Sequence, residues 1–194
     1  SKFVRFVGAG GYSHVTKSGD RQMYRFSSPA EPGYPHQIEL LSRRPDHLRD
    51  VEAVVGKVPV DDSEYSLSAI LLDDDYYGLL ASGTAVTRKY GVPTLRHEYL
   101  PVFKMQAFDN LTARRARGEG IRSGEIGKHR RDIFRLVAML PEDTKVDLPE
   151  PIREEVRRFL GLVNLPSRNY MKSIGLGNAT LDEITAAIRS VYLE

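Results

Sequence analysis

Apolar and polar positions follow a strand-like pattern in the first half of the chain and a helical period in the second. Residues 23–27 alternate, and residues 37–42 form a short apolar run with a single acid. A segment rich in proline and glycine separates them, so the pattern predicts two neighbouring strands joined by a loop. Residues 51–60 predict another extended stretch, residues 65–72 fit a strand or a helix, and residues 86–95 fit a strand pair or a strand with a loop.

From Glu98 onward, apolar residues recur at helical spacing and predict four helices. The apolar stripe of the first comprises Leu100, Phe103, Ala107 and Leu111. The four helices are expected to start near Glu98, at about Gly124, near Ile152 and after Thr180. Ser123 is the expected N-cap of the second helix, and Thr180 with Glu183 forms a capping box for the fourth. The pattern predicts an α+β chain with a sheet region at residues 1–96 and a C-terminal helical bundle at residues 97–194.

The composition is that of a folded globular protein. The chain has 194 residues, of which 41% are hydrophobic and 28% are charged, and these values are ordinary. The chain contains no cysteine, which excludes a disulfide framework, a thiolate nucleophile and an iron–sulfur site and fits a reducing cytosol. No apolar run approaches the roughly 20 residues that span a bilayer. We therefore expect a cytoplasmic location and no membrane partner.

Charge is unevenly distributed, although the formal net charge is only +2. Between residues 61 and 75 every charged residue is an acid: Asp61, Asp62, Glu64, Asp73, Asp74 and Asp75. Between residues 114 and 135 bases outnumber acids, and these bases are Arg114, Arg115, Arg117, Arg122, Lys128, Arg130, Arg131 and Arg135. The two patches can serve a metal ion and a polyanion respectively, or they are two solvated faces.

Lys104 lies on the apolar stripe of the first predicted helix, where a charge is unusual. An isolated ammonium ion in an apolar interior costs several kcal/mol, so it must be paired or reach a cavity. Asp132, beside the apolar stripe of the second helix, meets Lys104 if the two helices form an antiparallel hairpin. The pair is then part of a site or a structural salt bridge. Alternatively, the lysine stem lies along the core while its head stays in water.

Glu39 is a second exception to the pattern, because it is an acid within an apolar run. The flanking apolar residues indicate a central strand, and alternation places Ile38 and Leu40 on the face opposite to Glu39. A carboxylate that projects from such a strand into a cleft is a ligand for a divalent metal. The alternative is that Glu39 points to solvent from a sheet with one buried face.

Three other patterns do not define a site. The glycine-rich segment at residues 6–11 is similar to the start of a dinucleotide-binding fold, but Ser13 stands at its third glycine position and no helical pattern follows. For the acids at residues 73–75, a helix start is favoured over chelation of Mg²⁺, because acids stabilise a helix N-terminus. The histidines lack metal-ligand spacing, so zinc is not expected, and His129 is expected to pack against the helix hairpin.

Several blocks of the sequence are informative when they are considered together. In the first half they are residues 24–26, 34–35, 38–43 and 66–77. The strongest block comprises residues 100–112, Arg115, Gly118, Glu119 and residues 128–136. Together these blocks resemble bacterial nucleotidyltransferase-like proteins of the AbiEii/AbiGii toxin type, with the last block similar to that family's lysine helix and its Lys-x-x-x-Asp helix. The resemblance covers most of residues 3–140.

The resemblance implies a partial nucleotidyltransferase-like mixed sheet followed by helices, with Mg²⁺ as cofactor and a nucleoside triphosphate as substrate. By position, Glu39 would be a catalytic carboxylate that binds metal, Lys104 the lysine that reaches the triphosphate, and Asp132 the catalytic acid on the next helix. Lys128 and Arg115 would join Lys104 in binding the nucleotide. In this chemistry, metal-bound carboxylates align the nucleophile with the α-phosphorus, and a cation steadies the departing pyrophosphate.

The family's Gly-Ser turn and its Asp-x-Asp strand are not found in the sequence. By the resemblance they would lie upstream of residue 1, and residue 1 would fall near the helix that follows that strand. A two-metal site needs those two acids. We therefore expect a later part of a longer protein or a degenerate member of the family, and we expect this chain alone not to transfer nucleotides.

Three hypotheses for function follow. In the first, the protein transfers a nucleotide to an RNA, such as a tRNA, or to a protein once an N-terminal segment completes the site. In the second, it is a catalytically inactive module that grips RNA phosphates or an acidic partner through Arg114, Arg115, Arg117, Arg122, Arg130 and Arg131. In the third, the C-terminal helix at residues 180–194 docks on another chain, as a contact with an antitoxin would.

Overall fold

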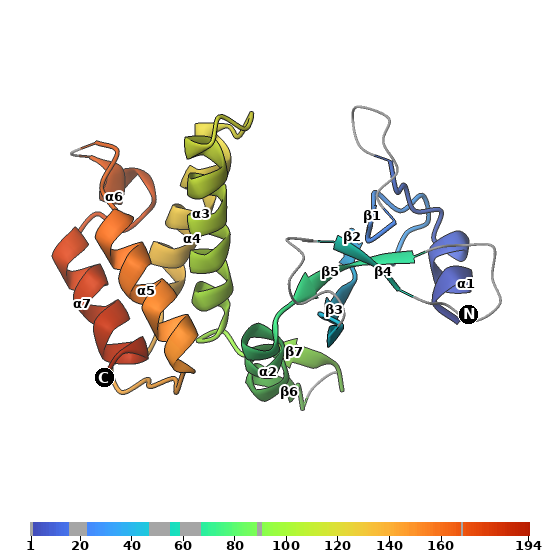
Figure 1. Ribbon diagram of the computed structural model, residues 1–194, viewed down its shortest axis with the longest axis horizontal. Helices are drawn as coiled ribbons and strands as arrows, with labels where there is room; N and C mark the ends of the chain where they lie inside the picture. The colour runs from blue at the N-terminus through green and yellow to red at the C-terminus, as the bar shows by residue number, and fades with distance from the viewer. Residues whose placement is uncertain (1, 16–22, 47–54, 59–66, 89–90, 168) are drawn as a thin grey trace. The chain divides into compact units, whose positions relative to one another are not determined.

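Short strands occupy the first part of the chain and helices the second in the computed structural model of the protein (Figure 1). The structure describes residues 2–15, 23–46, 55–58, 67–88, 91–167 and 169–194. The α+β class is confirmed. The chain divides into unit 1, Ser1–Tyr77, and unit 2, Gly78–Glu194. Residues 78–96 therefore group with the helices, and not with the strands as the sequence indicated.

The first two strands form an antiparallel pair. β1 (Arg25–Ser27) and β2 (Gln37–Glu39) place Phe26 opposite Ile38, which confirms the two neighbouring strands predicted from the sequence. Among the described residues this sheet has only these two strands, so the central position predicted for β2 is not observed. The apolar run at residues 37–42 has a different explanation. One face of β2 packs on the core, and the residues after β2 continue into a second sheet.

Leu40 connects the pair to this second sheet. Its amide donates a hydrogen bond to the Tyr24 carbonyl, and its carbonyl accepts one from the Ile70 amide, each at 2.8 Å. The order of strands in the second sheet is β3 (Leu41–Arg43), β5 (Leu67–Leu72) and β4 (Val55–Val58). β5 runs parallel to β3 and antiparallel to β4. The ambiguous run at residues 65–72 thus contributes a strand to a mixed sheet.

A small aromatic core holds unit 1 together. Helix α1 (Lys2–Ala9) packs on β1 through Phe3, whose ring meets that of Phe26 edge-on at 5.4 Å between centroids. Tyr12 and Phe26 are the buried centre of this cluster, and the Tyr12 hydroxyl donates to the Pro35 carbonyl at 2.6 Å. No residue of α1 is itself fully buried. The helix therefore covers the core without being enclosed by it.

The segment at residues 73–99 leads into the helices of unit 2. The amide of Tyr76 donates to Asp73 Oδ1 at 2.8 Å where α2 (Asp74–Gly83) begins, so the helix-start interpretation of these acids is confirmed. β6 (Thr84–Val86) and β7 (Pro93–Leu95) form an antiparallel pair, as one of the two alternatives predicted. The side chains of Leu95 and Tyr99 pack closely on Gly83, which explains why residues 78–96 group with the helices.

The remaining helices of unit 2 share one core. They are α3 (Leu100–Ala116), α4 (Ser123–Val137), α5 (Glu150–Leu162), the short α6 (Tyr170–Ser173) and α7 (Leu181–Tyr192). α3 and α7 each pack against both α4 and α5. The largest buried side chains include Met105, Phe108, Ile133, Phe134, Ile152, Phe159, Ile188 and Tyr192. Burying one such side chain contributes roughly 1.5–3 kcal/mol, so this core is the main source of stability in unit 2.

Two details of the predicted helices are wrong. Ser123 is already the first helical residue of α4, and Arg122 stands at the N-cap position without a side-chain cap, so the Ser123 hydroxyl does not cap the helix. On α3 the buried residues are Pro101, Val102, Met105 and Phe108, whereas the predicted stripe is only partly buried. α4 and α5 both pack on α3, and the directions of two partners, which periodicity does not encode, set its buried face.

The C-terminal helix is integrated into unit 2. The capping box is present, because the Glu183 amide donates to Thr180 Oγ1 at 3.2 Å and the Thr180 amide donates to Glu183 Oε2 at 2.7 Å. Ile184, Ile188 and Val191 are buried within the unit, so this apolar stripe is not available to dock on another chain. Among the described residues, no helix has the length and apolarity that a bilayer crossing requires.

Candidate functional site

Lys104 and Asp132 meet across the α3–α4 hairpin. Lys104 Nζ donates a hydrogen bond to Asp132 Oδ2 at 3.0 Å, and each side chain is 23% exposed. The next residues along the two helices, Met105 and Ile133, are buried, so the pair lies at the edge of the core and remains within reach of solvent. The antiparallel hairpin and the contact predicted from the sequence are confirmed.

The environment of Asp132 keeps its carboxylate ionised. Burial by itself raises the pKa of Asp132, but the hydrogen bond from Lys104 and the charges of Lys104, Arg131 and Lys128 outweigh it and bring the pKa below its ordinary value. The ionised carboxylate holds the Lys104 ammonium in place. A lysine has three N–H donors and the bond to Asp132 uses one, so the ammonium can also donate to a ligand.

His129 lies one helical turn before Asp132 and is the third titratable group of this cluster. Its Nδ1 atom is enclosed and has no hydrogen-bond partner in the described part of the chain. Burial lowers the pKa of His129, and the charge of Lys104 lowers it further. The imidazole is therefore neutral at physiological pH. The sequence assigned His129 only to packing, because the enclosure of a ring nitrogen depends on tertiary contacts.

The arginines near the turn between α3 and α4 are partly neutralised. Glu119 accepts hydrogen bonds from Arg114 Nε at 2.7 Å and from Arg117 Nη2 at 3.1 Å. By contrast, Arg115, Arg122 and Lys128 are exposed, and the ion pairs of the described residues do not include them. Of the predicted phosphate-binding residues in this region, these three are available to an anion.

Arg130 and Arg131 have different surroundings. Arg130 Nη1 donates to the backbone and side-chain oxygens of Asn164, each at 3.1 Å, and the guanidinium lies 5.1 Å from the centroid of the Tyr170 ring. Arg131 Nε lies 3.7 Å from Asp132 Oδ1. Arg130 thus connects α4 to the chain that follows α5, whereas Arg131 adds positive charge beside the Lys104–Asp132 pair.

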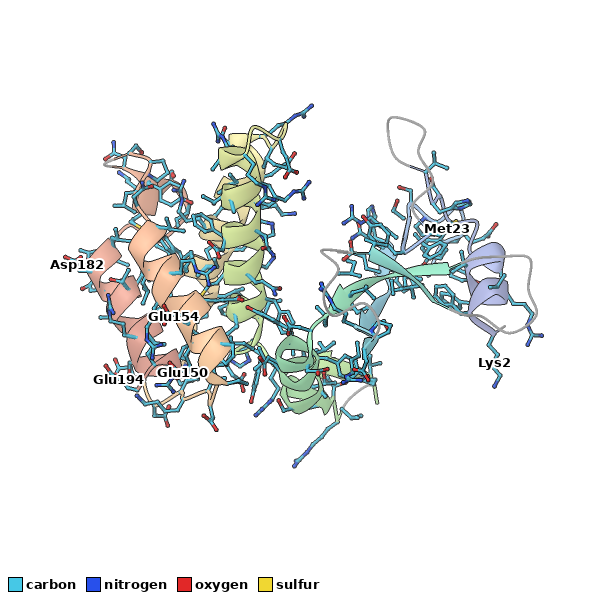
Figure 2. All side chains as sticks on the ribbon, viewed as in Figure 1. Lys2, Met23, Glu150, Glu154, Asp182 and Glu194 are labelled. Atoms are coloured by element: carbon cyan, nitrogen blue, oxygen red, sulfur yellow. The ribbon has the colours of Figure 1, made fainter. Side chains whose placement is uncertain are left out.

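Many acids of unit 2 lie on other helices. Glu150 and Glu154 on α5 pair with Arg157 at 2.6 and 3.0 Å. Asp182 lies at the start of α7 and Glu194 follows its end (Figure 2). The α3–α4 hairpin, in contrast, carries more bases than acids, so formal positive charge is concentrated in this part of unit 2.

Glu39 pairs with an arginine of the neighbouring strand. Arg25 and Glu39 are opposite each other in the β1–β2 register, and Arg25 Nε donates to Glu39 Oε1 at 2.6 Å. The Glu39 side chain is 34% exposed. Ile38 and Leu40, on the opposite face, pack against the aromatic core of unit 1. This is the arrangement of a sheet with one buried face, which was the alternative to a metal ligand.

The described residues around Glu39 do not form a magnesium site. Mg²⁺ needs near-octahedral oxygen ligands, whereas Glu39 is a single carboxylate that Arg25 already engages. In the part of the chain that the structure describes, no group of three or more His, Cys, Asp or Glu is placed to hold a metal. The acids at residues 61–64 lie outside the described residues. Glu39 belongs to unit 1, and Lys104 and Asp132 belong to unit 2, so their predicted common pocket stays a prediction.

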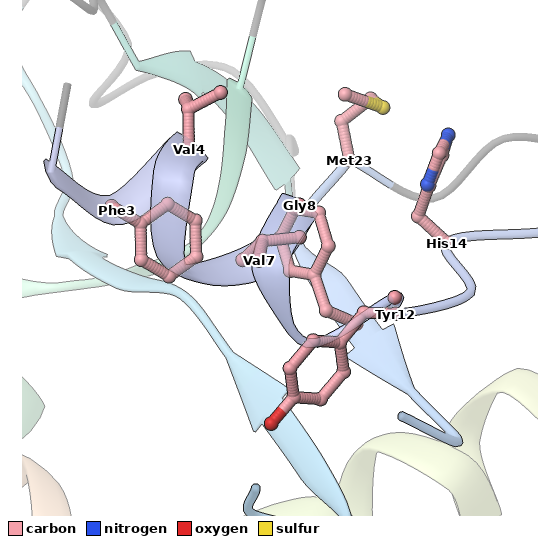
Figure 3. A pocket seen from close by; sticks show the side chains of 9 residues that line it. Phe3, Val4, Val7, Gly8, Tyr12, His14 and Met23 are labelled. Carbon is pink, nitrogen blue, oxygen red and sulfur yellow. The ribbon is translucent and has the colours of Figure 1, made fainter. Parts of the chain in front are cut away.

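Two hollows of unit 1 contain none of these residues. A cavity of about 230 Å³ beside α1 is lined by apolar side chains that include Phe3, Val7 and Phe26 (Figure 3). A second hollow, of about 260 Å³, is lined by Arg44 and the acids at residues 73–75. None of the predicted catalytic and nucleotide-binding residues lines either hollow.

Comparisons with protein-family models, with curated proteins and with solved structures find no match. The chemistry of the α3–α4 hairpin is therefore the main guide to function.

Proposed function

We propose that this protein is a nucleotidyltransferase-like protein of the AbiEii/AbiGii toxin type, and that it binds a nucleoside triphosphate through the α3–α4 hairpin. The observation that carries the proposal is the contact between Lys104 and Asp132 at 3.0 Å. These are the two residues that the resemblance assigns to the triphosphate lysine and to the acid on the next helix. They are 28 residues apart in the sequence and form an ion pair at the edge of a core.

The electrostatics of the hairpin support an anionic ligand. Asp132 is surrounded by Lys104, Lys128 and Arg131, all of which act on its pKa. Three cations around one carboxylate leave an excess of positive charge. A triphosphate that accepts hydrogen bonds from Lys104 compensates this charge, and charge-assisted hydrogen bonds are about twice as strong as neutral ones. Arg115 and Lys128 are the further nucleotide-binding residues of the proposal.

The fold is compatible with the family's finer architecture. A mixed sheet of β3, β5 and β4 precedes the helical bundle, and the presence of a helix at Lys2–Ala9 supports the expectation of a helix near residue 1. These features support the proposal of a partial nucleotidyltransferase-like sheet. Mg²⁺ would bind together with the triphosphate. The donors around Glu39 do not fit a magnesium ion, so it has no protein site there in this proposal.

In this proposal the chain handles the triphosphate, and transfer to an RNA or protein acceptor needs the two carboxylates of an Asp-x-Asp strand. Each role then has a chemical reason. Lys104 neutralises charge that develops on the departing pyrophosphate, and Asp132 holds that lysine in position through their hydrogen bond. Without the other carboxylates the nucleophile is not aligned, so the chain binds nucleotides and does not transfer them.

Calorimetric titration of the full chain with ATP, GTP, CTP and UTP in the presence of Mg²⁺ tests this function. We expect at least one triphosphate to bind, and we expect Lys104→Ala to weaken it about 10- to 100-fold, which corresponds to the roughly 1.5–3 kcal/mol of a hydrogen bond to a charged group. Lys172→Ala is the matched control, because Lys172 is an exposed lysine of the same unit. Absence of binding, or equal weakening by both variants, would contradict the proposal.

A second function, a catalytically inactive RNA-binding module, is favoured by one observation. Arg115, Arg122 and Lys128 are exposed, and none has an ion pair among the described residues. Binding driven by phosphates weakens steeply with salt. A gel-shift titration with total RNA at two salt concentrations therefore tests it. RNA binding that is salt-sensitive and lost in Arg115→Ala/Arg122→Ala, with no triphosphate binding, would favour this module over the first proposal.

A further inference from the structure

The Lys104–Asp132 pair has a neighbour whose ring nitrogen is not used by the fold. His129 shares a face of α4 with Asp132, because residues three apart lie one above the other on a helix. Its Nδ1 atom is enclosed and lacks a hydrogen-bond partner in the described part of the chain. Enclosed polar atoms are normally paired, so an unpaired nitrogen next to a charged pair needs an explanation.

The charges around His129 explain why it stays neutral without a ligand. Those that act on it are Lys104 from α3 and Lys128 and Asp132 from its own helix. The two cations disfavour an imidazolium ion and the single carboxylate favours it. Because burial also disfavours the charged form, the neutral state prevails in the free protein.

We propose that His129 is a further anion-binding residue of this site, and that it takes up a proton when a polyphosphate binds against Lys104. This inference rests on the proposed function, since it needs a polyphosphate at Lys104. A bound polyphosphate places several negative charges next to Lys104, whose own charge acts on His129. These charges offset the field of Lys104 and Lys128, and they favour the imidazolium ion over the neutral ring.

Proton uptake and binding are then linked in both directions. An imidazolium ion at position 129 strengthens the attraction for the polyphosphate, so the site binds more tightly as the pH falls through the range in which His129 titrates. One pKa unit of difference between the free and bound states corresponds to a tenfold change in affinity. We expect a gain of about three- to tenfold between pH 8 and pH 5.5 beyond the gain due to the ligand's own protonation.

Histidine titration by nuclear magnetic resonance tests this inference on the full chain. The imidazole signal of His129 is assigned by its absence in His129→Gln and is followed from pH 5 to 8, with and without inorganic tripolyphosphate. We expect its midpoint to move to higher pH with tripolyphosphate. The signals of the other histidines of the chain serve as the internal reference. An unchanged midpoint in the presence of bound tripolyphosphate would overturn the inference.

A second measurement uses the variant itself. Tripolyphosphate binding to the wild type and to His129→Gln is compared at pH 5.5 and pH 8, so that protonation of the ligand cancels between the two proteins. We expect the two affinities to differ at pH 5.5 and to converge at pH 8. Equal pH dependence of both proteins overturns the role of His129 and leaves the proposed function intact. If tripolyphosphate does not bind the wild type at all, the proposed function fails and this inference fails with it.

Discussion

At the scale of single residues, Lys104 and Asp132 form a charged contact at the edge of a core, and the enclosed ring nitrogen of His129 lies one helical turn from Asp132. Lys104 and Asp132 were predictable because each is a charge beside an apolar stripe. His129 was not, since a histidine beside a core is ordinary and only tertiary packing encloses its Nδ1 atom. The partner of Glu39 was also not predictable from the sequence, because Arg25 becomes its neighbour only through the strand register.

The Lys104–Asp132 contact has a measurable effect on stability. Asp132→Asn leaves the ammonium of Lys104 partly buried without its counter-charge. Exposed pairs contribute less than about 1 kcal/mol, and loss of one partner of a buried pair costs about 3–5 kcal/mol. For this partly exposed pair we expect a loss of about 1–2 kcal/mol in the free energy of unfolding, measured by urea denaturation. The control is Asp182→Asn, at an exposed acid at the start of α7. Equal stability of Asp132→Asn and the wild type would show that the pair is fully screened by water.

The pH dependence of stability reports on His129. The pKa of His129 is lowered in the folded protein, so the unfolded chain binds the proton first as the pH falls. The resulting stability is present above the ordinary pKa of about 6.5 and is lost as the pH falls through the folded value. We expect the free energy of unfolding to decline below pH 6.5 in the wild type, with a smaller decline in His129→Gln. Asp132, whose pKa is also lowered, contributes in a separate window, below about pH 4. Identical declines in wild type and variant would contradict the assignment to His129.

At the scale of elements, the periodicity of apolar residues located the helices of unit 2 but did not predict which of their faces pack against other helices. α5 buries Ile152, Val156 and Phe159 at helical spacing, and α7 buries Ile184, Ile188 and Val191, because each has one clear apolar face. α3 has two helical partners, and its buried face is offset from the predicted one. The strands of unit 1 are short, and the division of the run at residues 37–42 between two sheets depends on hydrogen bonds of Leu40 that a pattern of side chains does not reveal.

The capping box of α7 offers a test at this scale. Thr180→Ala removes the side-chain acceptor of the Glu183 amide, and loss of an N-cap costs typically about 1 kcal/mol. We expect this loss in urea denaturation. Thr180→Ser retains a hydroxyl at the same position and should retain most of the stability. A Thr180→Ala protein as stable as the wild type would mean that water replaces the cap without cost.

At the scale of the whole molecule, the sequence distinguished a strand-rich part from a helical part but placed their boundary too late. The packing of Leu95 and Tyr99 on Gly83 brings the β6–β7 pair into unit 2, and side-chain periodicity does not indicate such a contact. The bundle also ties its ends together, because the Tyr192 hydroxyl donates to the Glu98 carbonyl at 2.7 Å. The last helix of unit 2 is therefore bonded to the start of its helical bundle.

Because its last helix is bonded to the start of its helical bundle, we expect unit 2 to fold independently. A fragment of residues 78–194 retains the core of α3, α4, α5 and α7, and we expect it to show helical circular dichroism and a single cooperative unfolding transition. Tyr192→Phe in the fragment removes the bond to Glu98 and should cost about 1 kcal/mol. A fragment without a cooperative transition would show that the bundle depends on unit 1.

The measurement that tests the central claim most directly is a thermodynamic cycle between Lys104 and the phosphates of the ligand. The affinities of ATP, ADP and AMP are determined for the wild-type chain and for Lys104→Met, which keeps a side chain of similar length without the charge. If Lys104 contacts the terminal phosphates, the wild type prefers ATP over AMP by about tenfold or more, and Lys104→Met loses most of this preference. If the preference is the same in both proteins, the α3–α4 hairpin is not the triphosphate site.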